Sequence, residues 1–567
     1  MQSVKLLFCL IFILLTHATI AWLINQPQDA GPDVPSGKLR SLSFAPYHDG
    51  FSPIEQKFPE PGHVDADVRV VADKTYNIRT YSVRGGMQPT PEFARQYGVD
   101  MIMGGWLGDG HPENKIEIQT LIQAANQNQD VVKRVIVGNE VLLRKDMDID
   151  TLIGYIRQVK QAVKQPVTYA DVWSSYMQYP QLFNEVDFIT IHILPYWEDE
   201  PVAIENAAEH VEKIVKQIQD KARSMGVNKP ILIGESGWPA VGRQRGSAVP
   251  SVVNEARFIR ELIQVADRQG FDYNIVEAFN QPWKSNSEGV VGANWGMLDI
   301  NREPVFPLTG PVMEKPNWLL HFAWATALYL ILVAFYFKRL QILSTLRLVL
   351  FLSLTQVLSV CLINLVDYLW QTSYSDWQRF YTVGMVMANT ALGILLTQRW
   401  YALLSDSPSG EFWAKALDYA YRLFACLAVY KTYYLAFNGR YLSFPVEQFA
   451  IPVVGILGLM ACVGWSKSRC NFADFKLTEL MGSHLLNPYQ RYLAYLLSFG
   501  VVAVVIGEIY SFMSAYDFIQ AHPDFSEGLP VALGYSLQNQ QLVSWLFCIL
   551  ILSLPFWPSS RTKSAKA

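Results

Sequence analysis

Cysteine is absent between residues 30 and 310, the longest continuous part of the chain without extended apolar runs. This absence excludes a disulfide framework and a thiolate metal site from that part. It also contains no His-x-x-x-His, no Cys-x-x-Cys and no close acidic cluster, so we expect neither a metal nor another cofactor there. The six cysteines lie elsewhere: Cys9, Cys361, Cys426, Cys462, Cys470 and Cys548.

Charge is also scarce, because only 17% of the 567 residues are charged and the formal net charge is −4. No basic stripe is visible before residue 305, and nucleic acid is therefore not expected as a partner. The apolar excess is concentrated after Pro316, whereas the residues before about 305 have an ordinary globular composition. A chain of this length and this uneven composition predicts at least two domains.

Long apolar runs predict transmembrane helices. Residues 1–24 are long enough to span a bilayer and are interpreted as an uncleaved signal-anchor, with a cleaved signal peptide as the alternative. A linker follows at 25–38, and a second linker at 306–316 precedes a seven-helix transmembrane domain at 317–557. The seven apolar runs in that domain are about 317–337, 342–364, 381–397, 412–437, 447–466, 492–514 and 540–557.

Basic residues gather in alternate connections between these runs, for example at Lys338 and Arg339, at Arg399 and Lys415, at Lys467, Arg469, Lys476 and Arg491, and in the tail at 558–567. The positive-inside rule places such connections in the cytoplasm. Eight spans then put both termini inside and residues 25–316 outside. We expect a multi-pass protein of the inner cell membrane with a basic cytoplasmic tail, and, in a bacterium, a catalytic domain in the periplasm.

Between residues 39 and 305, apolar strand patterns alternate with helical patterns. Runs such as Ile231-Leu232-Ile233 are apolar on both faces, as parallel strands covered by helices must be. Eight such units match an α/β (β/α)8 TIM barrel followed by a polytopic α-helical membrane domain. The alternative, an open doubly wound sheet, requires a Gly-rich phosphate loop that residues 43–47 lack. The expected strands are 41–47, 75–82, 99–104, 133–140, 167–173, 186–194, 230–235 and 272–279.

Two of these strands end in a glutamate, Glu140 and Glu235. In such a barrel the C-terminal strand ends face one site, so the sequence predicts two carboxyl groups in one cleft. Two carboxyl groups in one cleft can break a glycosidic bond. The simpler interpretation is that Glu140 and Glu235 are two unrelated surface glutamates. The other polar and aromatic candidates at the strand ends are Tyr47, Arg79, Tyr81, Asn139, His192, Tyr196, Trp197, Trp238, Glu277, Asn280 and Trp283, which we expect to bind substrate.

Three segments resemble glycoside hydrolase family 17: Gly138-Asn139-Glu140, the run Gly234-Glu235-Ser236-Gly237-Trp238-Pro239, and the run from Glu277 to Lys284. That family holds plant β-1,3-glucanases and fungal β-1,3-glucanosyltransferases. The resemblance implies a retaining mechanism with Glu140 as acid/base and Glu235 as nucleophile. It further implies that Asn139 bonds the sugar 2-hydroxyl and that Arg79 keeps the nucleophile ionised. The chain departs from the family at Leu194, where plant members carry tyrosine, and at Asn280 and Gln281, where fungal transferases carry acids.

The helices after the barrel resemble those of membrane-bound bacterial members associated with β-glucan synthesis, including β-1,6-glucan synthases. The resemblance implies cleavage of β-1,3-glucan and transfer of the glycosyl unit to water or to another glucan, by elongation, 1,6-branching or cyclisation, during periplasmic glucan synthesis. The expected partners are a β-glucan and the lipid bilayer, with a glucan synthase as a candidate protein partner. The alternative is a glucan-sensing or glucan-export membrane protein, in which Glu508, inside an expected span, takes part. A single acid bonded to a neighbouring helix is the plainer interpretation of Glu508.

Overall fold

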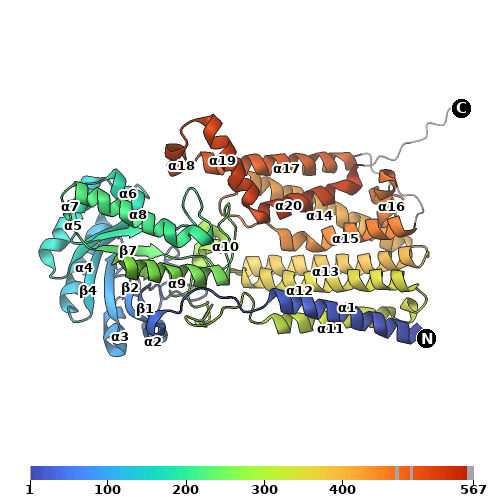
Figure 1. Cartoon of the computed structure of the whole chain (residues 1–567), viewed down its shortest axis with the longest axis horizontal. Coiled ribbons are helices and arrows are strands. Elements are labelled where there is room, and N and C mark those ends of the chain that lie inside the picture. Colours follow the sequence, from blue (N-terminus) through green and yellow to red (C-terminus); the bar gives the residue numbers. More distant parts are fainter. Residues whose placement is uncertain (1, 467–470, 486–488, 558–567) are drawn as a thin grey trace. The chain divides into compact units, whose positions relative to one another are not determined.

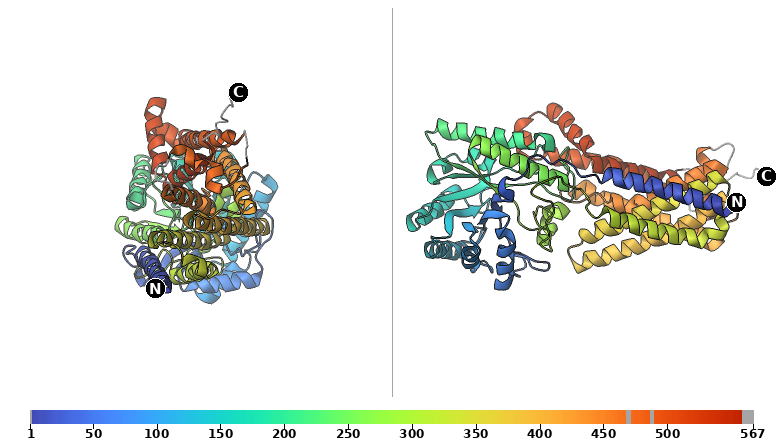
Figure 2. Two further views of the ribbon diagram at one scale, coloured as in Figure 1. Left: turned by 90° about the vertical axis from the view of Figure 1, so that its right-hand side faces the viewer. Right: turned by 60° about the horizontal axis from the view of Figure 1, so that its bottom comes forward.

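The computed structural model describes residues 2–466, 471–485 and 489–557 (Figures 1 and 2). Lys467, Arg469 and the expected basic tail at 558–567 lie outside the described residues. The chain divides into two compact units. One is Pro27–Glu314, the barrel unit, and the other combines Met1–Gln26 with Lys315–Ala567, the helical unit.

The barrel unit is a closed sheet of eight parallel strands in the order of the sequence, β1 to β8, which confirms the predicted fold class (Figure 1). Leu42 of β1 pairs with Ile275 of β8 and closes the ring. Ile102, Ile136, Ala170, Phe188 and Leu232 form a buried apolar cluster of their own, separate from the main core. The strands are β1 (Leu39–Ser43), β2 (Thr75–Arg79), β3 (Asp100–Gly105), β4 (Val132–Asn139), β5 (Val167–Val172), β6 (Ile189–His192), β7 (Ile231–Ser236) and β8 (Asp272–Ile275).

Helices follow the strands and cover the outside of the sheet. Their ends follow ordinary capping chemistry: the Ser251 hydroxyl accepts a hydrogen bond from Asn254 N at 3.1 Å, and Gly270 closes the same helix with φ of 72°. The Asp148 side chain caps another helix by accepting from Thr151 N at 2.9 Å. The helices of the barrel unit are α2 (Pro61–Ala72), α3 (Thr90–Tyr97), α4 (His111–Gln127), α5 (Ile149–Ala162), α6 (Trp173–Gln178), α7 (Leu182–Glu185), α8 (Ile204–Ser224), α9 (Val252–Gln269) and α10 (Ser285–Gly292).

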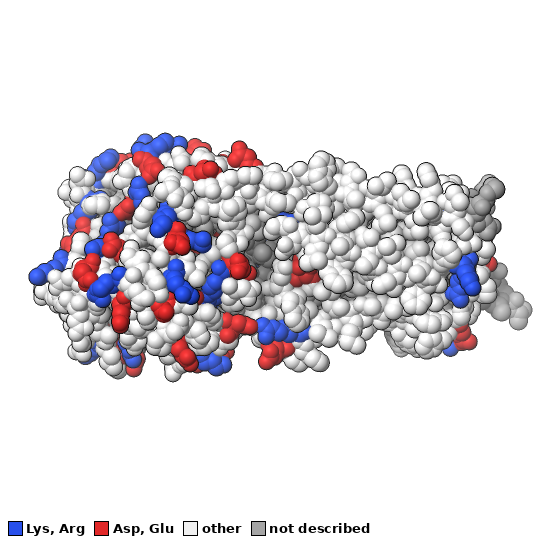
Figure 3. All heavy atoms as spheres, turned by 90° about the horizontal axis from the view of Figure 1, so that it is seen from below, with Lys and Arg blue, Asp and Glu red and all other residues white. Residues whose placement is uncertain are grey.

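The helical unit consists of long apolar helices. Within the described ranges, six of them, α1, α11, α12, α13, α15 and α17, are long and apolar enough to cross a membrane, and the bent pair α19 and α20 makes up to seven. On the face in Figure 3, charged side chains are dense over the barrel unit and sparse along the helical unit. The bounds are α1 (Gln2–Ile24), α11 (Trp318–Leu340), α12 (Thr345–Gln371), α13 (Asp376–Leu404), α14 (Glu411–Asn438), α15 (Val446–Ser466), α16 (Leu477–Met481), α17 (Gln490–Met513), α18 (Tyr516–Ala521), α19 (Phe525–Gln538) and α20 (Gln540–Ser553).

Among the described residues, the expected span at 412–437 is not one of these candidate helices, and the one at 540–557 qualifies only as part of the bent pair. The span at 412–437 corresponds to α14, which packs against α17 and carries Asp418 and Arg422. Asp418 is fully buried, bonds Arg422 one turn away at 2.5 Å and accepts from the Ser483 hydroxyl at 2.6 Å. The side chains of Asp418 and Arg422 are directed into the interior of the helical unit. They lower the mean hydropathy of α14, but they are not on the outer surface of the unit. The count of eight spans stays a prediction.

Glu508 lies in α17 with 7% of its surface exposed. The Asn539 amide donates a hydrogen bond of 3.4 Å to Glu508 Oε1. Asn539 lies between α19 and α20, which are bent by 76° relative to each other. This contact agrees with the plainer interpretation, an acid bonded to a neighbouring helix.

Candidate active site

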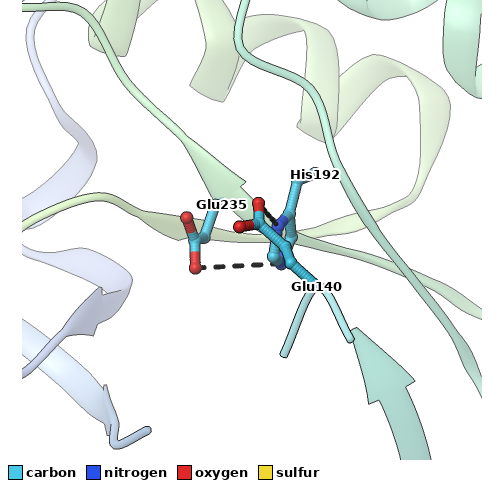
Figure 4. Close-up of side chains that lie close together, drawn as sticks. All are labelled: Glu140, His192 and Glu235. Carbon is cyan, nitrogen blue, oxygen red and sulfur yellow. Dashed lines mark hydrogen bonds and ion pairs between the residues drawn. The ribbon is translucent and has the colours of Figure 1, made fainter. Parts of the chain in front are cut away.

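Glu140 and Glu235 meet at the C-terminal ends of β4 and β7, with His192 from the end of β6 between them (Figure 4). One oxygen of each carboxyl group and one ring nitrogen of His192 lie within 4.8 Å of one another. Nδ1 of His192 is 3.0 Å from Glu140 Oε1, and Nε2 is 3.8 Å from Glu235 Oε1. The two carboxyl groups that the sequence singled out therefore share one site.

The backbone around Glu140 is bent in a way that few residues adopt. Gly138 has φ of 83° and Glu140 has φ of 52°, both in the left-handed region. Glu140 N donates to Ala170 O at 2.9 Å, which fixes the end of β4 against β5. A left-handed non-glycine residue costs free energy, and such residues gather where function requires a particular orientation. Here the bend leaves the Glu140 side chain 24% exposed.

Glycine is required before Glu235 for reasons of space. A Cβ atom on Gly234 would lie 2.7 Å from Thr190 Cγ2 and 3.1 Å from the His192 ring. A side chain at 234 would therefore push β6 and its histidine away from β7. The small residue in the Gly-Glu-Ser-Gly-Trp-Pro run thus places His192 beside both carboxyl groups.

Arg79 at the end of β2 binds Glu235 directly. Its Nη1 donates to Glu235 Oε1 at 2.8 Å, and its Nη2 donates to the amide oxygen of Asn139. Burial alone raises the pKa of Glu235, but the charges of His192, Arg79 and Lys284 outweigh it and lower that pKa to about 2. Glu235 is therefore ionised at neutral pH, and the expected contact between Arg79 and Glu235 is present.

A second carboxylate cluster lies beside the first. Lys284 Nζ bonds Glu277 Oε1 at 2.6 Å, and Glu277 is 1% exposed. Burial raises the pKa of Glu277 to about 7, although the Lys284 ammonium opposes the shift. Burial also raises the pKa of Glu288 on α10, with smaller contributions from the charges of Glu140 and Glu235. Lys284 and Glu288 were not among the sequence candidates, although Lys284 closes one of the motifs.

Asp171 at the end of β5 supports the loop that follows Glu140. It accepts hydrogen bonds from the Tyr169 hydroxyl, from Ser175 Oγ at 3.0 Å and from Leu142 N at 3.3 Å. Burial raises the pKa of Asp171, and the nearby Glu140 charge acts in the same direction. These bonds hold the backbone just after Glu140 in place.

Two aromatic candidates have no free face for a sugar, which corrects the expectation that they bind substrate. Trp238 is 0% exposed, packs against Phe258 and donates from Nε1 to Val249 O at 2.9 Å. Tyr196 is also 0% exposed and donates to the carbonyl of Arg243. Both follow strands on the correct edge of the barrel, but their rings point into its core.

The remaining aromatic and amide candidates are partly exposed or bonded to residues of the site. Trp283 is half-buried, lies edge-on to Tyr47 at 6.1 Å between ring centroids and donates to Gln281 Oε1 at 2.8 Å. Trp197 is half-buried and stacks on Trp295 at 6.3 Å. Tyr81 and Asn280 have structural partners. The Tyr81 hydroxyl donates to Ser43 Oγ at 2.9 Å, and the Asn280 side chain accepts from Gly296 N at 2.9 Å.

Glu140, His192 and Glu235 also have the donor types and spacing that a divalent cation accepts. An ion bound there would compete with the Arg79 guanidinium for Glu235 Oε1 and would occupy the space between the two carboxyl groups. The same arrangement has the spacing of an acid and a nucleophile on either side of a glycosidic bond.

Comparison with known proteins identifies the family of the barrel unit. Residues 41–296 match the BtgE/BtgC glycoside hydrolase domain. A glucan 1,3-beta-glucosidase of Schizosaccharomyces pombe is 30% identical over 240 residues, which are 40% of this chain and 74% of the relative. The chain belongs to the BtgE/BtgC glycoside hydrolase family. The glucan 1,3-beta-glucosidase of Arthroderma benhamiae is 29% identical over 256 residues, 42% of this chain and 82% of that relative.

Among solved structures, the chain is similar to a beta-1,3-glucanosyltransferase of Rhizomucor miehei, an active-site mutant in complex with laminaritriose. The identity is 27%, the likeness covers 48% of this chain and 96% of that one, and the TM-score is 0.42. The matched BtgE/BtgC region contains both Glu140 and Glu235. It ends before the helical unit that begins at Lys315.

Proposed function

We propose that the barrel unit is a retaining glycosidase and transglycosylase that acts on β-1,3-glucan. The observation that carries the proposal is the approach of a Glu140 oxygen to a Glu235 oxygen within 4.8 Å. Retaining enzymes hold their carboxyl groups about 5–5.5 Å apart, whereas inverting enzymes need roughly 6.5–9.5 Å to admit a water. The narrow spacing supports double displacement.

In the first step, the ionised Glu235 attacks the anomeric carbon while Glu140 gives its proton to the departing glycosidic oxygen. The Arg79 guanidinium, 2.8 Å from Glu235 Oε1, keeps the nucleophile charged until the bond forms. In the second step, Glu140 takes a proton from the acceptor hydroxyl, whose oxygen displaces Glu235 from the same carbon. Two inversions restore the β configuration.

The acceptor decides between hydrolysis and transfer. We propose that another glucan hydroxyl competes with water, so that the enzyme elongates, branches or cyclises glucan. The half-buried ring of Trp283, which follows β8, supports this proposal because it offers an apolar surface for a second sugar ring. The similarity to fungal glucan 1,3-beta-glucosidases supports a β-1,3-linked donor.

We further propose that the helical unit holds the enzyme in a cell membrane with the barrel unit on the outer side. The six apolar helices and the bent pair support a membrane position. Lys338 and Arg339 in the last turn of α11 support the inner location of that end. A site outside the cytoplasm suits remodelling of glucan during its synthesis.

The proposal is tested by incubating the whole chain, purified in detergent, with β-1,3-gluco-oligosaccharides and resolving the products by size and linkage. Products longer than the substrate, absent with Glu235→Gln, would establish transfer by this site, and new 1,6 linkages would establish branching. Exclusively shorter products would leave a hydrolase. No turnover of any β-glucan would contradict the proposed function.

A further inference from the structure

A polar cavity lies at one end of the helical unit, where α11 and α13 finish and α14 begins. Its volume is about 220 Å³. Leu395, Leu417 and Met481 supply apolar wall, and no acidic side chain belongs to its lining among the described residues. The groups available to a polar ligand are Arg339, Gln398, Arg399, Tyr401, Ser409 and Trp413.

Arg399 is held rigidly in this cavity. Its Nε donates to Leu480 O at 2.8 Å, its Nη2 to Glu479 O at 2.7 Å and its Nη1 to Ser409 Oγ at 2.7 Å. A guanidinium has five N–H donors, so two remain for a ligand. These three partners are uncharged, and the nearby Glu479 carboxylate forms its ion pair with Lys476 at 3.4 Å.

Arg339 brings a second positive charge from the last turn of α11. The residue is exposed, and its side chain forms no ion pair or hydrogen bond with the described residues. Its carbonyl accepts from the Tyr401 hydroxyl at 3.4 Å, which ties the end of α11 to α13. Two other cations are already paired, since Arg347 bonds Asp406 and Lys415 bonds Glu411, both at 2.6 Å.

We infer that this cavity binds the phosphate headgroup of an anionic phospholipid. Two guanidinium groups attract the single negative charge of a phosphodiester, and arginine forks suit its paired oxygens. The apolar wall suits the start of the acyl chains, and Trp413 is 41% exposed, as an indole at a bilayer interface is. Basic pockets between helices at the inner face of a membrane bind such headgroups. The inference rests on a membrane position for the helical unit and is independent of the glycosidase chemistry.

The test is native mass spectrometry of the whole chain released from phosphatidylglycerol or phosphatidylcholine nanodiscs. The wild type should retain one phosphatidylglycerol molecule in preference to phosphatidylcholine. Arg339→Gln should weaken that retention by about tenfold or more, which is the effect of one charge-assisted hydrogen bond. Lys338→Gln is the matched control, because it removes the same charge from the same helical turn but lies outside the cavity lining.

Arg339→Lys keeps the charge and should retain most of the binding, which separates loss of charge from loss of folding. Inorganic phosphate at millimolar concentration should leave the bound phosphatidylglycerol in place. Displacement by phosphate would assign the cavity to a free anion and overturn the lipid inference. Equal retention by the wild type and Arg339→Gln, or equal losses in Arg339→Gln and Lys338→Gln, would overturn it as well.

Discussion

Arg79 donates to Glu235 across the barrel, from the end of β2 to the end of β7, at 2.8 Å and with 1% of its side chain exposed. A buried arginine beside one of two neighbouring carboxyl groups makes the pair unequal, because it stabilises charge on its own partner. Glu140, whose contact is with His192, receives no such bond from Arg79. The contact with Arg79 supports the proposed role of Glu235 as the nucleophile.

The first prediction separates the two glutamates. Glu235→Gln should abolish turnover of every donor, because no covalent bond can form. Glu140→Gln should lose activity on glucan but retain part of it on an aryl β-glucoside or laminaribioside, whose leaving group needs no proton. Steady-state rates on both donor classes provide the measurement. Equal losses on the activated donor would show that the roles are assigned incorrectly.

The second prediction concerns stereochemistry. The spacing of the two carboxyl groups implies double displacement, so the first product should be the β anomer. Proton NMR during the first minutes of turnover distinguishes the anomers before mutarotation mixes them. An initial α product would exclude a covalent intermediate on Glu235.

The third prediction concerns pH. The Lys284 ammonium lowers the pKa of Glu235, which is about 2. Lys284→Met should therefore raise that pKa and move the acid limb of kcat/KM to higher pH, since the nucleophile must be ionised. The pH profile of the wild type and the variant provides the measurement. Lys216→Met, an exposed lysine on α8, is the matched control and should leave the profile unchanged.

The fourth prediction separates two tryptophans. Trp238→Phe should lower the free energy of unfolding by about 2 kcal/mol, because Val249 O loses its hydrogen bond and the core loses volume. Its KM should stay unchanged, since the ring has no exposed face. Trp283→Ala should instead raise KM and lower the ratio of transfer to hydrolysis. Denaturant unfolding and product analysis of both variants provide the measurements, and a reversed pattern would contradict the assignment.

The fifth prediction concerns topology. A reporter that is active only in the cytoplasm should function when fused after Ala567, and protease added to spheroplasts should remove residues 30–310. Both outcomes follow from an even number of spans with the basic connections inside. Protection of the barrel unit in intact spheroplasts would overturn its proposed outer location.

The eight strands and the pairing of Glu140 with Glu235 could be predicted because both depend on local pattern: an apolar run that ends in a polar residue. The strand ends were less predictable. β1 ends at Ser43 instead of residue 47, and β8 ends at Ile275 instead of residue 279. The residues just after each strand are also apolar, because they pack over the core, and the sequence therefore made both strands look longer than they are. An apolar run in the sequence does not show whether its backbone pairs in the sheet or forms a buried loop.

Side-chain direction was beyond prediction for a different reason. Trp238 and Trp283 both follow strands at the same edge, but one ring enters the core and the other stays half-buried. Only the neighbours from distant parts of the chain, such as Phe258 for Trp238, decide between these outcomes. The same holds for Glu288, whose position relative to Glu140 and Glu235 depends on the fold of α10 after β8.

The left-handed backbone at Glu140 has a consequence for laboratory evolution. Glycine adopts φ of 52° without strain, so a glycine at this position would relieve local strain while removing the proposed acid/base group. Stability therefore favours glycine at this position, whereas the proposed catalysis requires glutamate. A library selected for heat resistance alone would accumulate inactive survivors here, and directed evolution of this enzyme needs turnover in every round of selection.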